Sequence, residues 1–223
     1  EATKQLKDVF APDFHKNIIM AHPIAGKENS GLKFADKELF VDKKLILTTP
    51  ESSLNKDFHH EIKSLWTSIG SKITFTDSME HDTIYAYVSH YPQYLSFVLK
   101  ESLPIQDKEF SRLMLSPKSM WDEIFYFNQD NLRIINRSFI KKIHKEIAEE
   151  KSVFSSTKEI AAAQVIAACY KEIVPKSFLK YAGSGFNSFT SIISKNIESA
   201  KKIEFGVIKP ILKSFAADLE RRN

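Results

Sequence analysis

The pattern of apolar residues changes about one third of the way along the chain, and this change most constrains the fold. Before it, apolar runs suited to buried strands occur at residues 17–21 and 44–48, and residues 72–76 are rich in β-forming residues. Residues 54–69 have helical spacing and end before Gly70, a residue type that favours helix C-caps. This order predicts an α/β sheet in the first third of the chain.

Beyond that point the strand signal disappears. Apolar residues recur at spacings of three and four over residues 79–102, which predicts a long amphipathic helix. Pro92 lies inside this helix, so its ring must kink the helix and free a backbone carbonyl near Val88. Further helices are predicted at residues 117–127, 129–149, 156–172, 187–202 and 205–221. We therefore expect an α+β fold, mostly α, with a partial Rossmann-type α/β unit at residues 1–78 and an all-helical domain at residues 79–223.

Charge and composition narrow the range of partners. The 32 Lys and Arg residues are interleaved with 28 Asp and Glu residues, so no basic stripe favours nucleic-acid binding. The longest apolar run, near residues 160–169, is far shorter than the roughly 20 residues that span a bilayer, so no membrane insertion is expected. The single cysteine, Cys169, excludes an internal disulfide and fits a reducing cytoplasm. No Cys or His cluster has metal-ligand spacing, and we expect no metal.

His22 is the first candidate for a functional residue. It follows the apolar tripeptide Ile18-Ile-Met20, and we expect it just past the C-terminal end of a short strand, where open α/β sheets place their chemistry. Pro23 and Gly26 shape the loop that would hold the ring. An imidazole in this place is suited to bind a hydroxyl group or take its proton near neutral pH. The residues alone leave both a catalytic and a purely structural role open.

Residues 22–31 closely resemble the segment His-Pro-Ile-Ala-Gly-x-Glu-x-Ser-Gly of the prephenate and arogenate dehydrogenases. Three further matches follow in the family's order: Lys44-Leu-Ile-Leu-Thr-Thr-Pro50, then His81-Asp82 with Ser89-His90-Tyr91-Pro92, then Phe110-Ser-Arg112 with Ser116-Pro117 and Met120-Trp121. The resemblance spans residues 17 to about 130. It implies an oxidoreductase of tyrosine biosynthesis, which decarboxylates prephenate or arogenate oxidatively with NAD or NADP as the hydride acceptor.

The resemblance also implies roles for individual residues. His22 matches the family's catalytic histidine and would accept the proton of the substrate hydroxyl. Arg112 matches the arginine that binds a substrate carboxylate. Glu28 matches an acidic residue that orients groups or gates the pocket, and His90 lies in the family's Ser-His-x-Pro-His pattern. Gln93 replaces the last histidine of that pattern, which keeps hydrogen bonding but loses a possible positive charge.

The family's cofactor fingerprint has no counterpart in this sequence. No Gly-x-Gly-x-x-Gly stretch occurs in the 223 residues, so the residues that bind the cofactor stay unassigned. We therefore expect a chain that lacks the N-terminal part of the nucleotide-binding domain and binds a dinucleotide poorly by itself. The resemblance implies a homodimer formed through the helical domain. A separate N-terminal nucleotide-binding chain is one possible partner; a catalytically inactive remnant, serving only as a helical dimerisation or binding module, is the alternative.

Overall fold

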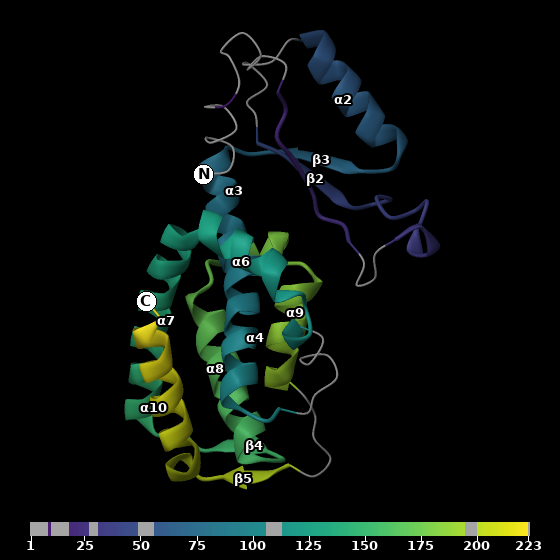
Figure 1. The fold of residues 1–223 in the computed structure, drawn as a ribbon. Coiled ribbons are helices and arrows are strands. Elements are labelled where there is room, and N and C mark those ends of the chain that lie inside the picture. Colours follow the sequence, from purple (N-terminus) through teal and green to yellow (C-terminus); the bar gives the residue numbers. More distant parts are fainter. Residues whose placement is uncertain are drawn as a thin grey trace. The chain divides into compact units, whose positions relative to one another are not determined.

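The computed structural model of the chain describes Val9 and residues 18–26, 31–48, 56–105, 113–194 and 200–222 (Figure 1). The chain divides after Thr83 into two compact units, and the division falls inside helix α3 (Ser78–Tyr85). Most of the described residues are helical, as the sequence predicts.

The first unit contains a three-stranded sheet with β2 (Lys44–Leu47) at its centre. Strand β2 pairs in parallel with β3 (Lys72–Phe75), and α2 (Lys56–Ser68) connects these two strands (Figure 1). Leu45, Ile46 and Leu47 are buried, as expected for a strand covered on both faces. The predicted strand, helix and strand of this βαβ unit are thus confirmed.

The first strand differs from the prediction. Strand β1 covers Ala21–Pro23 and pairs antiparallel with β2, so that His22 lies opposite Ile46. The amide of Thr48 donates to the carbonyl of Met20 (3.0 Å), which shows that pairing begins beside the apolar tripeptide and runs on into the motif. Pro23 is tolerated because β1 is the last strand on its side of the described sheet. The expectation that His22 follows the strand is therefore wrong: His22 is the middle residue of β1.

The helix predicted over residues 79–102 is interrupted where Pro92 requires it. Helix α3 is followed by a π-helical turn, Ala86–His90, and then by α4 (Tyr91–Ser102). Proline has no amide hydrogen, and its ring collides with the carbonyl four residues earlier, here that of Val88. The π-helical turn contains this residue and widens the backbone there. The predicted disturbance of the helix is confirmed.

The second unit is a bundle of helices with a small two-stranded sheet at one end (Figure 1). Its centre is aromatic, because Tyr91, Phe139, Tyr170 and Phe189 are all fully buried. The rings of Tyr91 and Tyr170 lie 5.5 Å apart. The other described helices of this unit are α6 (Lys118–Phe127), α7 (Gln129–Glu149), α8 (Lys158–Ile173), α9 (Ser184–Ser191) and α10 (Phe205–Arg221). Short 3-10 turns lie at Lys176–Tyr181 and Ile192–Ser194 in this unit, and at Leu32–Phe34 in the first unit.

The helix predicted over residues 187–202 is wrong at its end, whereas residues 195–199 lie outside the described residues. Helix α9 ends at Ser191, and β5 (Lys201–Ile203) pairs antiparallel with β4 (Val153–Ser155). The helical domain therefore contains a strand pair that was not predicted. Local helix propensity fails here because the pairing partner lies about fifty residues away in the sequence, and the pairing buries Ser155 and Ile203.

Gly70 provides a test of the first unit. Its φ is +87°, and a Cβ atom added there would lie 3.1 Å from the Cα of Val41. We expect Gly70→Ala to destabilise this unit by about 1–2 kcal/mol, the usual cost of a left-handed conformation with a side chain. Hydrogen exchange of the β2 amides measures the change. Gly26→Ala is the control, since a Cβ there meets nothing within 4 Å, and equal exchange in the two variants would contradict the expectation.

Candidate active site

His22 lies at one end of a hydrogen-bonded chain of three side chains. Its Nδ1 is 2.8 Å from Nε2 of His81, and Nδ1 of His81 is 3.0 Å from a carboxylate oxygen of Asp82. The two imidazole rings meet edge to face, with centroids 5.1 Å apart. All three residues belong to the first unit. We call this group the His22–His81–Asp82 chain.

The local sequence explains how α3 presents the last two members of this chain. The carboxylate of Asp77 accepts a hydrogen bond from the amide of Glu80 (2.8 Å), which caps the start of α3. This cap fixes where the helix begins. His81 and Asp82 follow Glu80 directly and therefore lie in the first turns of the helix. Both side chains are largely withdrawn from solvent, with 14% and 32% of their surfaces exposed.

The surroundings of His22 favour its neutral form. Burial, with a smaller contribution from the neighbouring His81, lowers the pKa of His22 from 6.5 to about 4, although Asp82 opposes the shift. Near neutral pH the ring therefore carries one hydrogen and one unprotonated nitrogen. An unprotonated nitrogen can accept a hydrogen bond from a hydroxyl group, which an imidazolium cannot do.

His90 lies in a second polar group, within the helical unit. It is the last residue of the π-helical turn, and its Nδ1 is 3.0 Å from the amide nitrogen of Asn128. Asn128 is buried where α6 meets α7, and the ring of Trp121 lies 6.4 Å from that of His90. Because an amide nitrogen only donates, Nδ1 of His90 must accept, which leaves the hydrogen of the neutral ring on Nε2.

Gln93 has a structural contact at the position where the family has histidine. The side chain is 3% exposed, and its amide nitrogen donates to the carbonyl of Leu113 (2.7 Å). The ammonium group of Lys100 donates to the next carbonyl, that of Met114 (2.9 Å). Two side chains of α4 thus hold the segment that follows Arg112. The proposed ligand-binding role of Gln93 stays a prediction, and its amide nitrogen is engaged with the backbone.

The predicted site residues therefore fall into separate groups. His22 lies with His81 and Asp82 in the first unit, whereas His90 and Gln93 lie in the second. Glu28 and Arg112 fall outside the described residues, so their predicted roles stay predictions.

Sequence reasoning missed the roles of three residues. His81 and Asp82 were noted only as a family match, and their hydrogen bonds to His22 and to each other were not predicted. Asn128 lies at the break between two predicted helices, where a buried amide often satisfies a neighbouring side chain.

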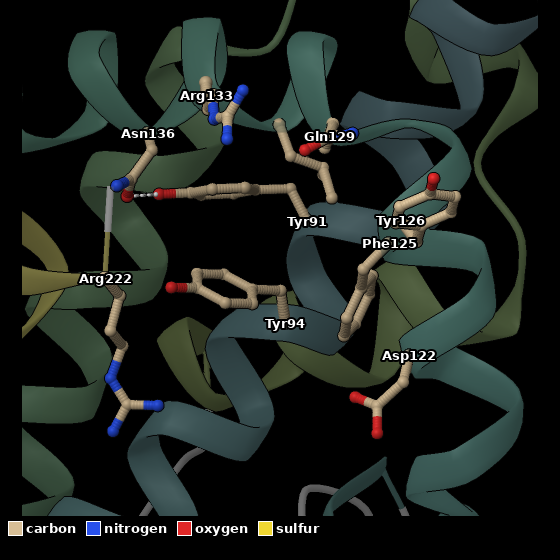
Figure 2. A pocket seen from close by; sticks show the side chains of 10 residues that line it. Tyr91, Tyr94, Asp122, Phe125, Tyr126, Gln129, Arg133, Asn136 and Arg222 are labelled. Carbon is tan, nitrogen blue, oxygen red and sulfur yellow. Dashed lines mark hydrogen bonds between the residues drawn. The ribbon is translucent and has the colours of Figure 1, made fainter. Parts of the chain in front are cut away.

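A cavity of about 300 Å³ lies in the helical unit between α4, α6 and α7 (Figure 2). Figure 2 shows the rings of Tyr91 and Tyr94 on one side, with the hydroxyl of Tyr91 bonded to Asn136 (2.6 Å). The guanidinium of Arg222 already pairs with Glu101 (2.6 Å) and Asp218 (2.9 Å). A carboxylate ligand would have to compete with both acids, so this cavity is a weaker candidate site than the His22–His81–Asp82 chain.

Other chemistry finds little support in the part of the chain that the structure describes. Burial raises the pKa of Cys169 to about 12, so its thiol is not a nucleophile at neutral pH. No group of three or more His, Cys, Asp or Glu side chains that would hold a metal ion gathers among the described residues. None of the described helices is long and apolar enough to cross a bilayer.

Comparison with known proteins adds independent findings. Residues 3–75 match the family model of the nucleotide-binding domain of prephenate dehydrogenase. Cyclohexadienyl dehydrogenase of Zymomonas mobilis is 28% identical over 151 residues, which cover 60% of this chain and 51% of that protein. Prephenate dehydrogenase of Bacillus subtilis is 25% identical over 142 residues, or 57% of this chain and 38% of that one. The chain spans about half the length, or less, of these curated relatives.

Solved structures agree with the sequence comparison. Prephenate dehydrogenase of Aquifex aeolicus, in complex with hydroxyphenyl propionate and NAD+, is 27% identical, with a TM-score of 0.52 over 58% of this chain and 50% of that chain. A further structure of the Aquifex aeolicus enzyme, 23% identical with a TM-score of 0.56, covers 81% of this chain and 61% of that chain, and shows the likeness of fold.

The fold and the matches together define a chain in which a Rossmann-like segment, similar to a nucleotide-binding domain, precedes a mostly helical unit. Residues 3–75 of the chain belong with the nucleotide-binding domain of prephenate dehydrogenase, and the chain is similar to prephenate and cyclohexadienyl dehydrogenases, as its motifs predict.

The lowered pKa of His22 predicts how stability depends on pH. The unfolded chain binds a proton at this residue near pH 6.5, whereas the folded chain binds it only near pH 4. Between these values the unfolded state holds more protons, so the free energy of unfolding falls as the pH falls. We expect His22→Gln to show a shallower fall than the parent protein in urea titrations over this window. Equal slopes in the two proteins would contradict the lowered pKa.

Proposed function

We propose that this chain provides the hydroxyl-binding part of a prephenate or arogenate dehydrogenase. The observation that carries the proposal is the neutral His22, which lies in the family's histidine motif and is hydrogen-bonded to His81. The reaction removes hydride from the ring carbon that bears the hydroxyl group and releases carbon dioxide. A neutral imidazole that accepts the hydroxyl proton assists this step, because positive charge develops on the carbon and its hydroxyl as the hydride leaves, and removal of the proton leaves an electron pair on the oxygen that offsets this charge.

A dinucleotide cofactor, NAD or NADP, is part of the proposal. It supplies the hydride acceptor when bound, and the family model and the NAD+ complex of the Aquifex aeolicus relative support it. The described residues themselves do not fit its pyrophosphate: neither they nor the sequence contain a glycine-rich turn between a strand and a helix. We therefore assign no residue of this chain to the cofactor and derive no step through it.

The substrate class follows from the family resemblance. The chain itself could act in either of two forms, as part of a split enzyme or as a catalytically inactive remnant. Prephenate and arogenate share the ring hydroxyl that His22 would bind, so the described residues do not choose between them. A separate nucleotide-binding polypeptide would complete a split enzyme. A catalytically inactive remnant would keep the helical unit as a dimerisation or binding module.

One assay distinguishes these forms. The chain is mixed with prephenate or arogenate and with NAD or NADP, with and without the polypeptide encoded directly upstream, and reduced nicotinamide is followed. Activity only with the added polypeptide supports a split enzyme, whereas activity of the chain alone would contradict the expectation that these residues bind a dinucleotide poorly by themselves. If no reduced nicotinamide forms under any condition and calorimetry detects no binding of either substrate, the catalytically inactive remnant is supported and the proposed function is wrong.

In whichever form is active, His22→Gln tests the catalytic assignment. Loss of a positioned general base lowers kcat by about 10²–10⁴-fold, and we expect a loss in this range. His60→Gln is the matched control, because His60 is an exposed histidine of the same unit. Unchanged turnover in His22→Gln would remove His22 from the mechanism.

A homodimer formed through the helical unit, in the cytoplasm, completes the proposal. The single cysteine, Cys169, is a buried free thiol, which suits a reducing compartment. Large apolar side chains are exposed on α6 and the start of α7, and such surfaces often mark protein interfaces. They are Met120, Tyr126, Phe127 and Ile134.

Ile134, which is 58% exposed, tests the dimer. We expect Ile134→Glu to shift the protein from dimer to monomer in sedimentation velocity, because burying a new carboxylate at an interface is costly. Arg133→Glu is the control for charge alone, since Arg133 is the exposed neighbour whose side chain pairs with Asp130. A parent protein that sediments as a monomer would exclude the proposed dimer.

A further inference from the structure

The hydrogen-bonding capacity of the His22–His81–Asp82 chain restricts where its protons lie. An ionised carboxylate only accepts, so Nδ1 of His81 must carry a hydrogen toward Asp82 (3.0 Å). In a neutral ring, Nε2 of His81 is then the acceptor. It lies 2.8 Å from Nδ1 of His22, which must therefore donate. Each neutral ring carries a single N–H hydrogen, and in both rings it lies on Nδ1. The nitrogen of His22 without a hydrogen, which can act as a base, is therefore Nε2.

A second arrangement is consistent with the same distances. If His81 carries a positive charge, its Nε2 donates to Nδ1 of His22, and the hydrogen of a neutral His22 lies on Nε2. The two arrangements differ by one proton, which enters at Nε2 of His22. The hydrogen on Nδ1 of His22 then passes to His81 over the 2.8 Å contact.

We propose that His81 and Asp82 are positioning residues that keep Nε2 of His22 ready to accept a hydroxyl proton, and that His81 takes up the resulting charge. This inference rests on the proposed function for the identity of the hydroxyl group. The O–H bond of the ligand breaks as a bond forms to Nε2, while the hydrogen on Nδ1 moves to Nε2 of His81. The reverse movement returns a proton to the oxygen of the product, so that no proton is gained or lost.

The surroundings explain why the charge belongs on His81. Burial disfavours an imidazolium at His22 and lowers its pKa to about 4. A charge on His81 instead lies 3.0 Å from the carboxylate of Asp82, and 32% of the Asp82 side chain still contacts solvent. The relay thus moves the positive charge one ring away from the position where the ligand binds, to a place where an opposite charge compensates it.

Nuclear magnetic resonance of ¹⁵N-labelled histidines tests the relay without any turnover. The signals of His22 are assigned by their loss in His22→Gln, and each ring nitrogen reports whether it carries a hydrogen. In the intact chain near neutral pH we expect Nδ1 of His22 to be protonated and Nε2 not. On uptake of one proton, the two nitrogens of His22 should exchange these states while both nitrogens of His81 become protonated.

Substitutions at His81 show whether the contact causes this pattern. His81→Phe keeps an aromatic ring of similar size but cannot accept a hydrogen bond, so we expect the Nε2-protonated form of His22 to become the major one. His81→Gln retains an acceptor oxygen and should show the original pattern. This second variant therefore distinguishes loss of the hydrogen bond from misfolding as the cause of a change in His81→Phe. His60→Phe, at an exposed position of the same unit, is the control and should leave the signals of His22 unchanged.

Three results would overturn the inference: Nε2 of His22 protonated in the resting protein, both His22 nitrogens protonated at the first step, or signals of His22 unchanged in His81→Phe. None of these resonance measurements requires a bound substrate or cofactor. A protein with the expected signals and no dehydrogenase activity therefore keeps the relay and loses only the proposed function.

Discussion

The pairing of β1 with β2 is the constraint on which the candidate site depends. Strand β2 is buried on both faces and hydrogen-bonded on both sides, so its position is the best determined in the first unit. The antiparallel register places His22 opposite Ile46 and fixes the backbone of the histidine motif. A histidine on an unpaired loop would need a substrate to order it. Here the sheet supplies the order in advance, and the side chain needs only a contact with α3 to settle its rotamer and tautomer.

The contact between His22 and His81 also allows a buried ring to act as a base. A buried histidine with a pKa of about 4 is a poor base by itself, since its protonated form is disfavoured. An exposed histidine would be more basic but would interact with water rather than a ligand. A second histidine, backed by Asp82, allows the first ring to stay neutral and desolvated while a charge is stabilised nearby. His81 lies 59 residues beyond His22 in the sequence, so only the fold brings the two motifs together.

Local patterns explain which parts of the structure the sequence could predict. Helices α2, α7 and α10 and strands β2 and β3 match their predicted ranges closely, because spacing and apolar content determine them within short windows. The first two residues of β5 were predicted as the end of a helix because the partner strand β4 is remote in the sequence. His22 was predicted by its motif, but its place inside β1 was not, since antiparallel pairing with β2 leaves no trace in the residues of the motif itself. The partners of His22 and His90 were missed for the same reason, as each lies on another element.

Gln93 departs from the family's histidine pattern, and its contacts in the structure show a role that the sequence difference alone did not predict. As a sequence difference, it suggested weaker carboxylate binding through the loss of a possible positive charge. In the structure its amide nitrogen holds the carbonyl of Leu113, directly after Arg112, while Lys100 holds the next carbonyl. A neutral amide suits this task because it donates without requiring a counter-charge in a site that is 3% exposed. Gln93 thus holds the residues that follow Arg112, while its predicted contact with a ligand stays a prediction.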